Sequence, residues 1–548
     1  MYIYLDIMNM KKLNWRYFMR KLLIMSLLFL TTIMYAAPKY GGTLVFGRSG
    51  DSVALDPAHV TDGESFYATK QVYDTLVQFK NGTTILEPGL ATSWEISKDG
   101  LEYTFHLRKG VYFAPTKFYN KKNEFTADDV IFSFKRQYDK KHPFNSVGGT
   151  YKYWGAMNMD KIVKDVVKVD KYTVKFILNK PEAPFLSNMA MDFASILSSQ
   201  YANDLLKEGK ADKLSRYPVG TGPFVFVKWV KDDKIIFKAN KDYWDGKPYI
   251  NKLILKVIPN SSVRAAELKV GSIHVMDFPN PEEVASLEAN PNIKLVKQEG
   301  LNVGYLALDQ VKFAPFRDVR VRRAINYAIN KEAIVKAIYA GFGRPAYSPI
   351  PPTMWSYNPN ITKYKYNPEK AKQLLKEAGY ENLEFELWAM PVARPYMPNA
   401  RKVAEAMQAD LAKVGVKTKI VSYDWGTYLN KGRHFEDDSC LLGWTGDNGD
   451  PDNFLDVLLT SHAAKIPASN RAGWKNKEFD ALVAKAKITT DIKERTKLYE
   501  QAQEVFAREV PWVTIANSLV VEPIRKNVMN FKLSPLGKRI FKKVWLDK

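Results

Sequence analysis

Hydrophobic and polar residues alternate with two different periods along this chain. Segments with apolar residues at every second position, rich in β-branched and aromatic side chains, predict strands at residues 42–47, 103–107, 173–178, 234–238, 253–258 and 303–308. Segments with apolar residues three or four positions apart predict helices at residues 127–138, 319–340, 368–378, 400–414, 476–486 and 492–510. Strands that alternate with helices of this length indicate an α/β architecture.

Local stop and turn signals support this division into elements. Asn367 is a suitable N-cap for the helix over 368–378, and Gly379 is a suitable residue to end it. Gly220 and Gly222, followed by Pro223, predict a tight turn that leads into another strand.

The first 36 residues have the composition of a secretory signal peptide. Five basic residues precede a mostly apolar stretch at 22–35, and Ala36 and Ala37 follow. The stretch is shorter than the roughly 20 residues of a transmembrane helix, although an uncleaved anchor is the alternative. We therefore predict export to the periplasm with cleavage near residues 36–37. Met34 or Tyr35 would occupy a position where a small residue is preferred, and translation could also begin further along the leader.

Cysteine content and charge narrow the class of protein. Cys440 is the only cysteine, so one chain forms no disulfide, and no cysteine after the leader offers a site for lipid attachment. The composition, with 46% hydrophobic and 26% charged residues, is typical of a globular protein. The net charge of +22 is spread along the chain among 59 acidic residues, which favours a solvated basic surface over a nucleic-acid site.

The sequence offers no recognisable catalytic or metal-binding motif. It lacks a G-x-S-x-G elbow, an H-E-x-x-H pair, a P-loop lysine motif and a glycine-rich dinucleotide fingerprint. The six histidines are scattered without ligand spacing. We therefore predict no catalytic residue, no metal site and no cofactor.

Several short segments, in a fixed order along the chain, closely resemble the family-5 extracellular solute-binding proteins. These segments are Glu87–Trp94, Asp99–Arg108, Phe125–Val130, Gly220–Phe224, Asp318–Arg320, Tyr327–Lys331 and Pro368–Ala371. That family supplies the peptide- and nickel-binding components of ABC importers. The resemblance implies a two-lobed periplasmic binding protein of the class II type, with a hinge and an additional third domain.

The same resemblance implies where the domains begin and end. The first lobe would be discontinuous, the additional domain would be inserted within it, and the second lobe would hold the main ligand contacts. The expected boundaries are 38–82, 216–300 and 517–548 for the first lobe, 83–215 for the additional domain and 301–516 for the second lobe. The chain would cross between the lobes near Gly300 and Ser518, and the lobes would close over the ligand by hinge motion.

Two segments, residues 388–396 and 443–454, resemble the dipeptide-binding subgroup of this family. The resemblance implies that Arg394 holds the peptide carboxylate and that Asp447 holds the free amine. A closed site must neutralise both termini of a dipeptide, because an unpaired buried charge costs several kcal/mol. Further candidate ligand contacts are Tyr396, Trp425, Trp444, Thr445 and Gly446.

Structural roles remain as alternatives for these residues. Asp447 lies near Asp450 and Asp452 among glycine and asparagine, a composition that also builds turns or metal-binding loops. Arg394 could form a salt bridge, and the aromatic residues could belong to the core.

The prediction is therefore a monomeric periplasmic component of an ABC importer, which captures dipeptides or other short peptides and delivers them to a membrane permease. Residues 49–67 and 461–474 lack cysteines that the enterobacterial dipeptide type has, so glutathione, haem or a metal chelate is the alternative ligand. A secreted peptide hydrolase is the third hypothesis, and the absent nucleophile and metal motifs disfavour it.

Overall fold

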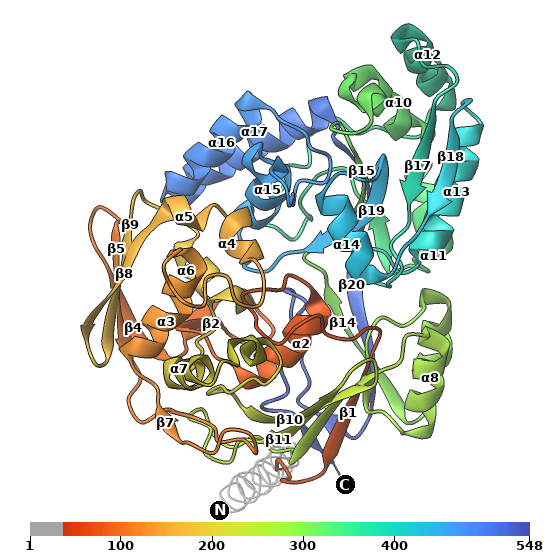
Figure 1. Ribbon diagram of the computed structural model, residues 1–548. Helices are drawn as coiled ribbons and strands as arrows, with labels where there is room; N and C mark the ends of the chain where they lie inside the picture. Colours follow the sequence, from red (N-terminus) through yellow and green to blue (C-terminus); the bar gives the residue numbers. More distant parts are fainter. Residues whose placement is uncertain (1–36, 548) are drawn as a thin grey trace, which may run out of the picture. The chain divides into compact units, whose positions relative to one another are not determined.

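The computed structural model describes residues 37–547, in which the longest sheet contains twelve strands and links two lobes (Figure 1). The strands of the first lobe are β1 (Thr43–Arg48), β10 (Phe224–Val230), β11 (Lys234–Ala239), β12 (Lys252–Val257), β13 (Val275–Met276) and β14 (Ile293–Glu299). Those of the second lobe are β15 (Asn302–Leu308), β16 (Gly343–Pro345), β17 (Glu384–Trp388), β18 (Lys417–Val421) and β19 (Ser439–Thr445). The remaining strand, β20 (Trp512–Arg525), pairs with strands of both lobes.

The strand β20 changes partner halfway along its length, and this is where the chain crosses between lobes. Its first part pairs with β15 and β16, whereas Leu519–Arg525 pair with β14. The second crossing is the short link between β14 and β15, and Asn302 ties the two crossings together. Its Nδ2 donates to the carbonyl oxygen of Ser518 at 3.0 Å, and its Oδ1 accepts from the Ser518 N–H at 3.0 Å.

The close contact between the two crossings requires glycine at position 300. A Cβ there would lie 1.9 Å from Nδ2 of Asn302 and 2.3 Å from the carbonyl oxygen of Ser518, closer than any real contact. The partner change thus falls where the lobe boundaries near Gly300 and Ser518 were expected. The complete domain boundaries remain a prediction.

A separate four-stranded antiparallel sheet lies within residues 91–178. Its strands follow the order β4 (Ala91–Ile96), β5 (Glu102–Leu107), β9 (Thr173–Leu178) and β8 (Val163–Asp170). Helix α3 (Ala127–Tyr138) packs against β8 and β9 (Figure 1). The other elements up to residue 207 are α2 (Gly63–Val72), β2 (Val77–Phe79), β3 (Leu86–Pro88), β6 (Tyr112–Phe113), β7 (Asn123–Glu124), α4 (Lys152–Ala156), α5 (Met159–Ile162), α6 (Phe185–Met189) and α7 (Ser199–Lys207).

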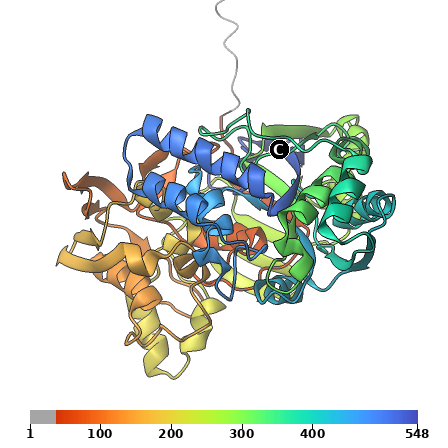
Figure 2. The same ribbon diagram turned by 90° about the horizontal axis from the view of Figure 1, so that it is seen from above.

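The later part of the chain contains most of the long helices. They are α10 (Val319–Ala328), α11 (Lys331–Ile338), α12 (Pro368–Ala378), α13 (Ala400–Ala412), α14 (Trp425–Arg433), α15 (Asp452–Leu459), α16 (Lys477–Ile488) and α17 (Ile492–Glu509). Helices α16 and α17 lie side by side, as both views show (Figure 2). The remaining elements are α8 (Ser261–Val270), α9 (Val284–Glu288), β21 (Val528–Met529) and β22 (Trp545–Leu546).

The predicted α/β architecture is confirmed, and the six predicted strands are present with ends shifted by at most one residue. The predicted single helix over 319–340 is wrong, because two helices occupy this stretch. Ile329 is extended, and the side chain of Asn330 accepts from the N–H of Ala333 and so begins α11 as its N-cap. The amphipathic pattern continues through residues 329 and 330, so the pattern alone did not reveal that the helix is interrupted there.

The N-terminal leader predicted at residues 1–36 lies outside the described residues. Within residues 37–547, no helix has both the length and the apolar character needed to cross a bilayer. Cys440 is buried on β19.

Candidate functional site

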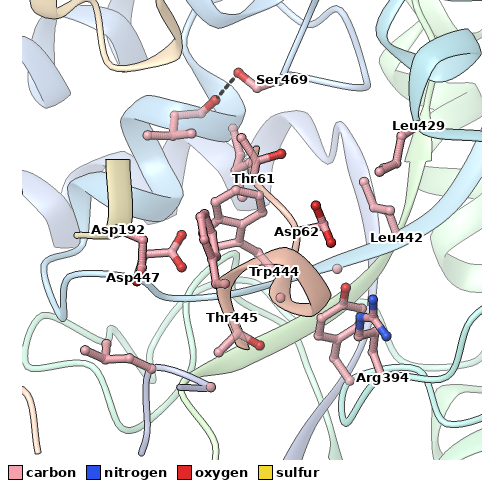
Figure 3. Close-up of a pocket in the computed structure, with 18 of the residues that line it drawn as sticks. Thr61, Asp62, Asp192, Arg394, Leu429, Leu442, Trp444, Thr445, Asp447 and Ser469 are labelled. Carbon is pink, nitrogen blue, oxygen red and sulfur yellow. Dashed lines mark hydrogen bonds between the residues drawn. The ribbon is translucent and has the colours of Figure 1, made fainter. Parts of the chain in front are cut away.

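A cavity of about 140 Å³ lies where both lobes, α4 and the start of α2 meet. It is about ten times the ~10–15 Å³ that a single water molecule needs, so it has room for an organic ligand. Six of the seven predicted ligand contacts line it: Arg394, Tyr396, Trp425, Trp444, Thr445 and Asp447. These residues come from the loop after β17, from α14 and from the end of β19, three segments that the fold brings together (Figure 3).

Gly446, the seventh, is not among the lining residues. Its N–H donates to the carbonyl oxygen of Leu301 at 2.8 Å, and a Cβ would lie 2.8 Å from side-chain atoms of Leu301 and Phe454. Its contribution is therefore to let the chain pack closely behind the cavity wall, rather than to touch a ligand.

Arg394 has one end of its guanidinium engaged and the other available. Nη1 donates to the carbonyl oxygen of Ala393 at 2.8 Å and lies 3.4 Å from Oε1 of Glu64. Nη2 is buried and has no hydrogen-bond partner among the described residues. The guanidinium also lies 5.3 Å from the ring centroid of Phe278 and 5.5 Å from that of Trp425. A buried donor without a partner is costly, and a carboxylate at Nη2 would satisfy it.

Glu64, on α2, is the acid nearest to Arg394, but it is shared among several groups. Its Oε1 accepts from the hydroxyl of Ser49 at 2.9 Å, and its Oε2 lies 4.0 Å from Nη1 of Arg48. Burial, together with the nearby Asp277, raises the pKa of Glu64 above its usual range. The pairing of Glu64 with Arg394 is therefore loose and leaves the arginine able to bind a second carboxylate.

Asp447 lies two residues beyond the end of β19 and is held by its backbone. Its N–H donates to Oδ1 of Asn453 at 2.8 Å, and the same oxygen accepts from Nε1 of Trp444 at 2.8 Å. The carboxylate accepts a hydrogen bond from the hydroxyl of Tyr153, on α4. Burial raises the pKa of Asp447 to about 7, although Tyr153 and Lys538 act in the opposite direction. An ammonium group would favour the ionised form.

Aromatic side chains form much of the remaining wall. The ring of Tyr396 packs on Gly443, where a Cβ would lie 2.2 Å from a ring carbon, so β19 needs glycine at this position. The hydroxyl of Tyr339 donates to the carbonyl oxygen of Tyr396 at 2.7 Å and fixes this segment. Trp444 stands between Arg394 and Asp447 in the view of Figure 3. Such walls contact a ligand without requiring a particular side chain.

The acids that follow Asp447 have structural partners. Both carboxylate oxygens of Asp450 accept from Nη2 of Arg495, at 2.8 and 2.9 Å, and Asp452 accepts from Nδ2 of Asn448 at 3.2 Å. Across residues 37–547, no group of three or more histidine, cysteine or acidic side chains is arranged to hold a metal ion.

Sequence reasoning missed most of the charged residues that line the cavity. They are Asp62, Lys152, Asp192, Arg433, Arg471, Lys538 and Arg539, together with the phenol of Tyr153. No motif or spacing marks them, because they come from segments separated by up to several hundred residues. Only the fold brings them to one surface.

The model of the bacterial extracellular solute-binding proteins, family 5 (middle region), matches residues 86–465. The chain belongs to this family, as the ordered segments predicted, and its fold is that of the two-lobed periplasmic binding proteins.

Individual relatives match nearly the whole chain. The dipeptide-binding protein of Escherichia coli K12 is 47% identical over 521 residues, which cover 94% of this chain and 97% of that protein. Heme-binding protein A of Haemophilus influenzae is 46% identical, and the match covers 92% of each. Among solved structures, an ABC transporter-associated periplasmic binding protein of Helicobacter pylori, in complex with the peptide STSA, is 48% identical with a TM-score of 0.89. That match covers 93% of this chain and 99% of the other.

Proposed function

We propose that this protein captures dipeptides or other short peptides in the periplasm and delivers them to the membrane permease of an ABC importer. Arg394 binds the peptide carboxylate and Asp447 binds the free amine. The observation that supports this most strongly is that Arg394 and Asp447 line the same cavity, and that one buried nitrogen of Arg394 has no hydrogen-bond partner in the described part of the chain.

The two groups suit peptide termini because every free peptide has one carboxylate and one ammonium, whatever its side chains. Arginine presents a planar set of donors that matches a carboxylate, and aspartate accepts the ammonium hydrogens. Arg394 is buried and Asp447 is half-buried, and this reduced contact with water strengthens each charge pair. The aromatic wall leaves the identity of the peptide side chains less restricted.

Localisation, assembly and domain boundaries belong to the same proposal. The leader at residues 1–36 directs export, the mature protein acts as a monomer, and the lobes with the boundaries given above close on the ligand. Closure requires that the peptide bind the closed form more tightly than the open form. The permease then recognises the closed form.

Haem is the second candidate ligand, because the Haemophilus influenzae relative named for haem binding is 46% identical over nearly its full length. The cavity has room for glutathione or a metal chelate as well, but none of the relatives named above supports these ligands as the Haemophilus influenzae protein supports haem. A peptide hydrolase is disfavoured by membership in a family of solute-binding proteins.

Titration calorimetry with the purified mature protein tests this function. Ligands would be a dipeptide, a tripeptide, the peptide STSA, glutathione and haem. Dipeptide binding should weaken by more than ~100-fold in Arg394→Ala and in Asp447→Ala, because loss of a buried charge partner costs about 3–5 kcal/mol.

Arg401→Ala is the matched control, because Arg401 is exposed on α13 and its one ion pair within residues 37–547 is with Glu405. Thermal unfolding of each variant would establish that it is folded. Dipeptide affinity within about threefold of the unsubstituted protein in both cavity variants would contradict the proposal, and haem binding without peptide binding would favour the second candidate.

A further inference from the structure

Three of the cations that line the cavity have no ion-pair partner within residues 37–547, unlike the other lining cations. Lys152 lies at the start of α4, Arg433 ends α14, and Arg471 lies in the loop that follows residues 462–464. Of the other lining cations, Lys538 pairs with Asp192 at 2.9 Å, and Arg539 pairs with Glu522.

The hydrogen bonds of Arg433 and Arg471 go to neutral groups. Nη2 of Arg433 donates to Oγ1 of Thr61 at 3.0 Å, and Nη1 of Arg471 donates to the carbonyl oxygen of Leu429 at 3.1 Å. Within residues 37–547, neither arginine nor Lys152 has a carboxylate oxygen within 4.0 Å. The set can therefore accept a carboxylate without displacing an existing ion pair.

The surrounding acids do not balance these cations. Asp62 acts electrostatically on Lys152 and Arg433, and Asp437 acts on Arg471. Three cations thus face two carboxylates, and one of these, Asp437, is not among the residues that line the cavity. A surplus of positive charge remains on this part of the wall.

Burial and mutual repulsion lower the pKa of two members of the group. Burial and the neighbouring Arg471 lower the pKa of Arg433 to about 9. Burial and Arg433 likewise lower the pKa of Lys152. A bound anion would relieve the repulsion between these side chains.

The three cations come from other segments of the chain than the arginine that receives the peptide carboxylate. They belong to α4, to the end of α14 and to the loop after residues 462–464. Arg394 lies in the loop after β17, and Asp447 lies just after β19. The cavity therefore presents three charged positions, one more than the termini of a peptide require.

We propose that Lys152, Arg433 and Arg471 form a subsite for a carboxylate side chain, so that short peptides containing glutamate or aspartate are the preferred ligands. This inference rests on the proposed function, since it assumes that Arg394 and Asp447 take the termini. A peptide with an acidic side chain then satisfies all three charged positions at once, and the third pair strengthens binding through a charge-assisted contact.

Isosteric peptide pairs test this subsite by calorimetry. Ala-Glu would be compared with Ala-Gln, and Glu-Ala with Gln-Ala, so that both side-chain positions are examined without changing size. At least one acidic peptide should bind about tenfold or more tightly than its amide counterpart. The difference should fall to about twofold in Arg433→Gln and shrink in Lys152→Gln, and it should persist in the exposed control Arg401→Gln.

The possible outcomes separate the two proposals. Tight binding of dipeptides with no preference for the acid at either position would overturn the subsite and leave the proposed function standing. A preference that persists unchanged in both cavity variants would overturn the assignment to these residues. If none of the four peptides binds, the proposed function fails and the subsite fails with it. Lys152 is only half-buried on a short helix, so its variant provides the test even if Arg433→Gln does not fold.

Discussion

The raised pKa of Asp447 predicts that peptide binding depends on pH near neutrality. Burial places this pKa at about 7, compared with 3.8 for an ordinary aspartate. In the unliganded protein the carboxyl group is therefore partly protonated at pH 6–7, whereas the ammonium of a peptide needs the ionised form. Binding must then be accompanied by release of a proton from Asp447.

The size of the effect follows from the position of the pKa. At pH 6, one unit below it, only about a tenth of the Asp447 carboxyl groups would be ionised, so affinity should be about tenfold weaker than its maximum, or about 1.4 kcal/mol. Above pH ~8 the α-amine of the peptide loses its own proton, and affinity should fall again. The maximum is expected between these limits, with a bell-shaped profile.

The stability of the unliganded protein should change in the opposite sense to its affinity. The folded state holds the Asp447 proton more tightly than the unfolded chain, so this contribution is present below the unfolded pKa of about 4. It is lost as the pH rises through about 7. Asp447→Asn should remove this part of the pH dependence of thermal unfolding.

Calorimetry in two buffers that differ in ionisation enthalpy would count the protons released. At pH 6 we expect close to one proton per peptide for the unsubstituted protein and none attributable to this site in Asp447→Asn. An affinity that stays constant from pH 6 to 7.5, with no proton release, would refute the reasoning. In that case the carboxylate is already ionised in the free protein or does not meet the amine.

Three further predictions concern the support of the site and of the lobes. Tyr153→Phe removes the hydroxyl that donates to the carboxylate of Asp447, so dipeptide affinity at pH 7 should fall by about tenfold. A dipeptide affinity that calorimetry finds unchanged would contradict this prediction. Gly220→Ala would place a Cβ 2.0 Å from the carbonyl oxygen of Val72, the last residue of α2. Denaturant unfolding should therefore show that the free energy of unfolding falls by about 2 kcal/mol or more. Gly155→Ala is the control, because its Cβ would have nothing within 4 Å, and it should not lower the free energy of unfolding. Arg136→Met leaves buried Asp56 without the two hydrogen bonds of 2.5 and 2.8 Å that it accepts from Arg136. Denaturant unfolding should show that the free energy of unfolding falls by about 3–5 kcal/mol. A decrease below about 1 kcal/mol would indicate that Asp56 finds another partner.

The parts of the fold that were predicted correctly are those fixed by neighbouring residues. Helix α12 begins and ends where the sequence predicts, because Asn367 caps it by accepting from the N–H of Lys370 and Gly379 adopts a left-handed φ of 79° at its end. Strand β20 is absent from the predicted set. Nearly all of its residues are buried, so it lacks the alternation that marks a strand with one exposed face.

The candidate site likewise has features that contiguous residues predict and features that only the folded chain shows. The sequence predicted export and determined the α/β class and the family. The resemblance singled out Arg394 and Asp447, because each lies in a segment whose residues are contiguous. Only the tertiary structure revealed the hydroxyl of Tyr153 on Asp447 and the cationic group of Lys152, Arg433 and Arg471. The physical reason is that burial, charge balance and pKa depend on distances between residues far apart in the chain, and folding alone sets those distances.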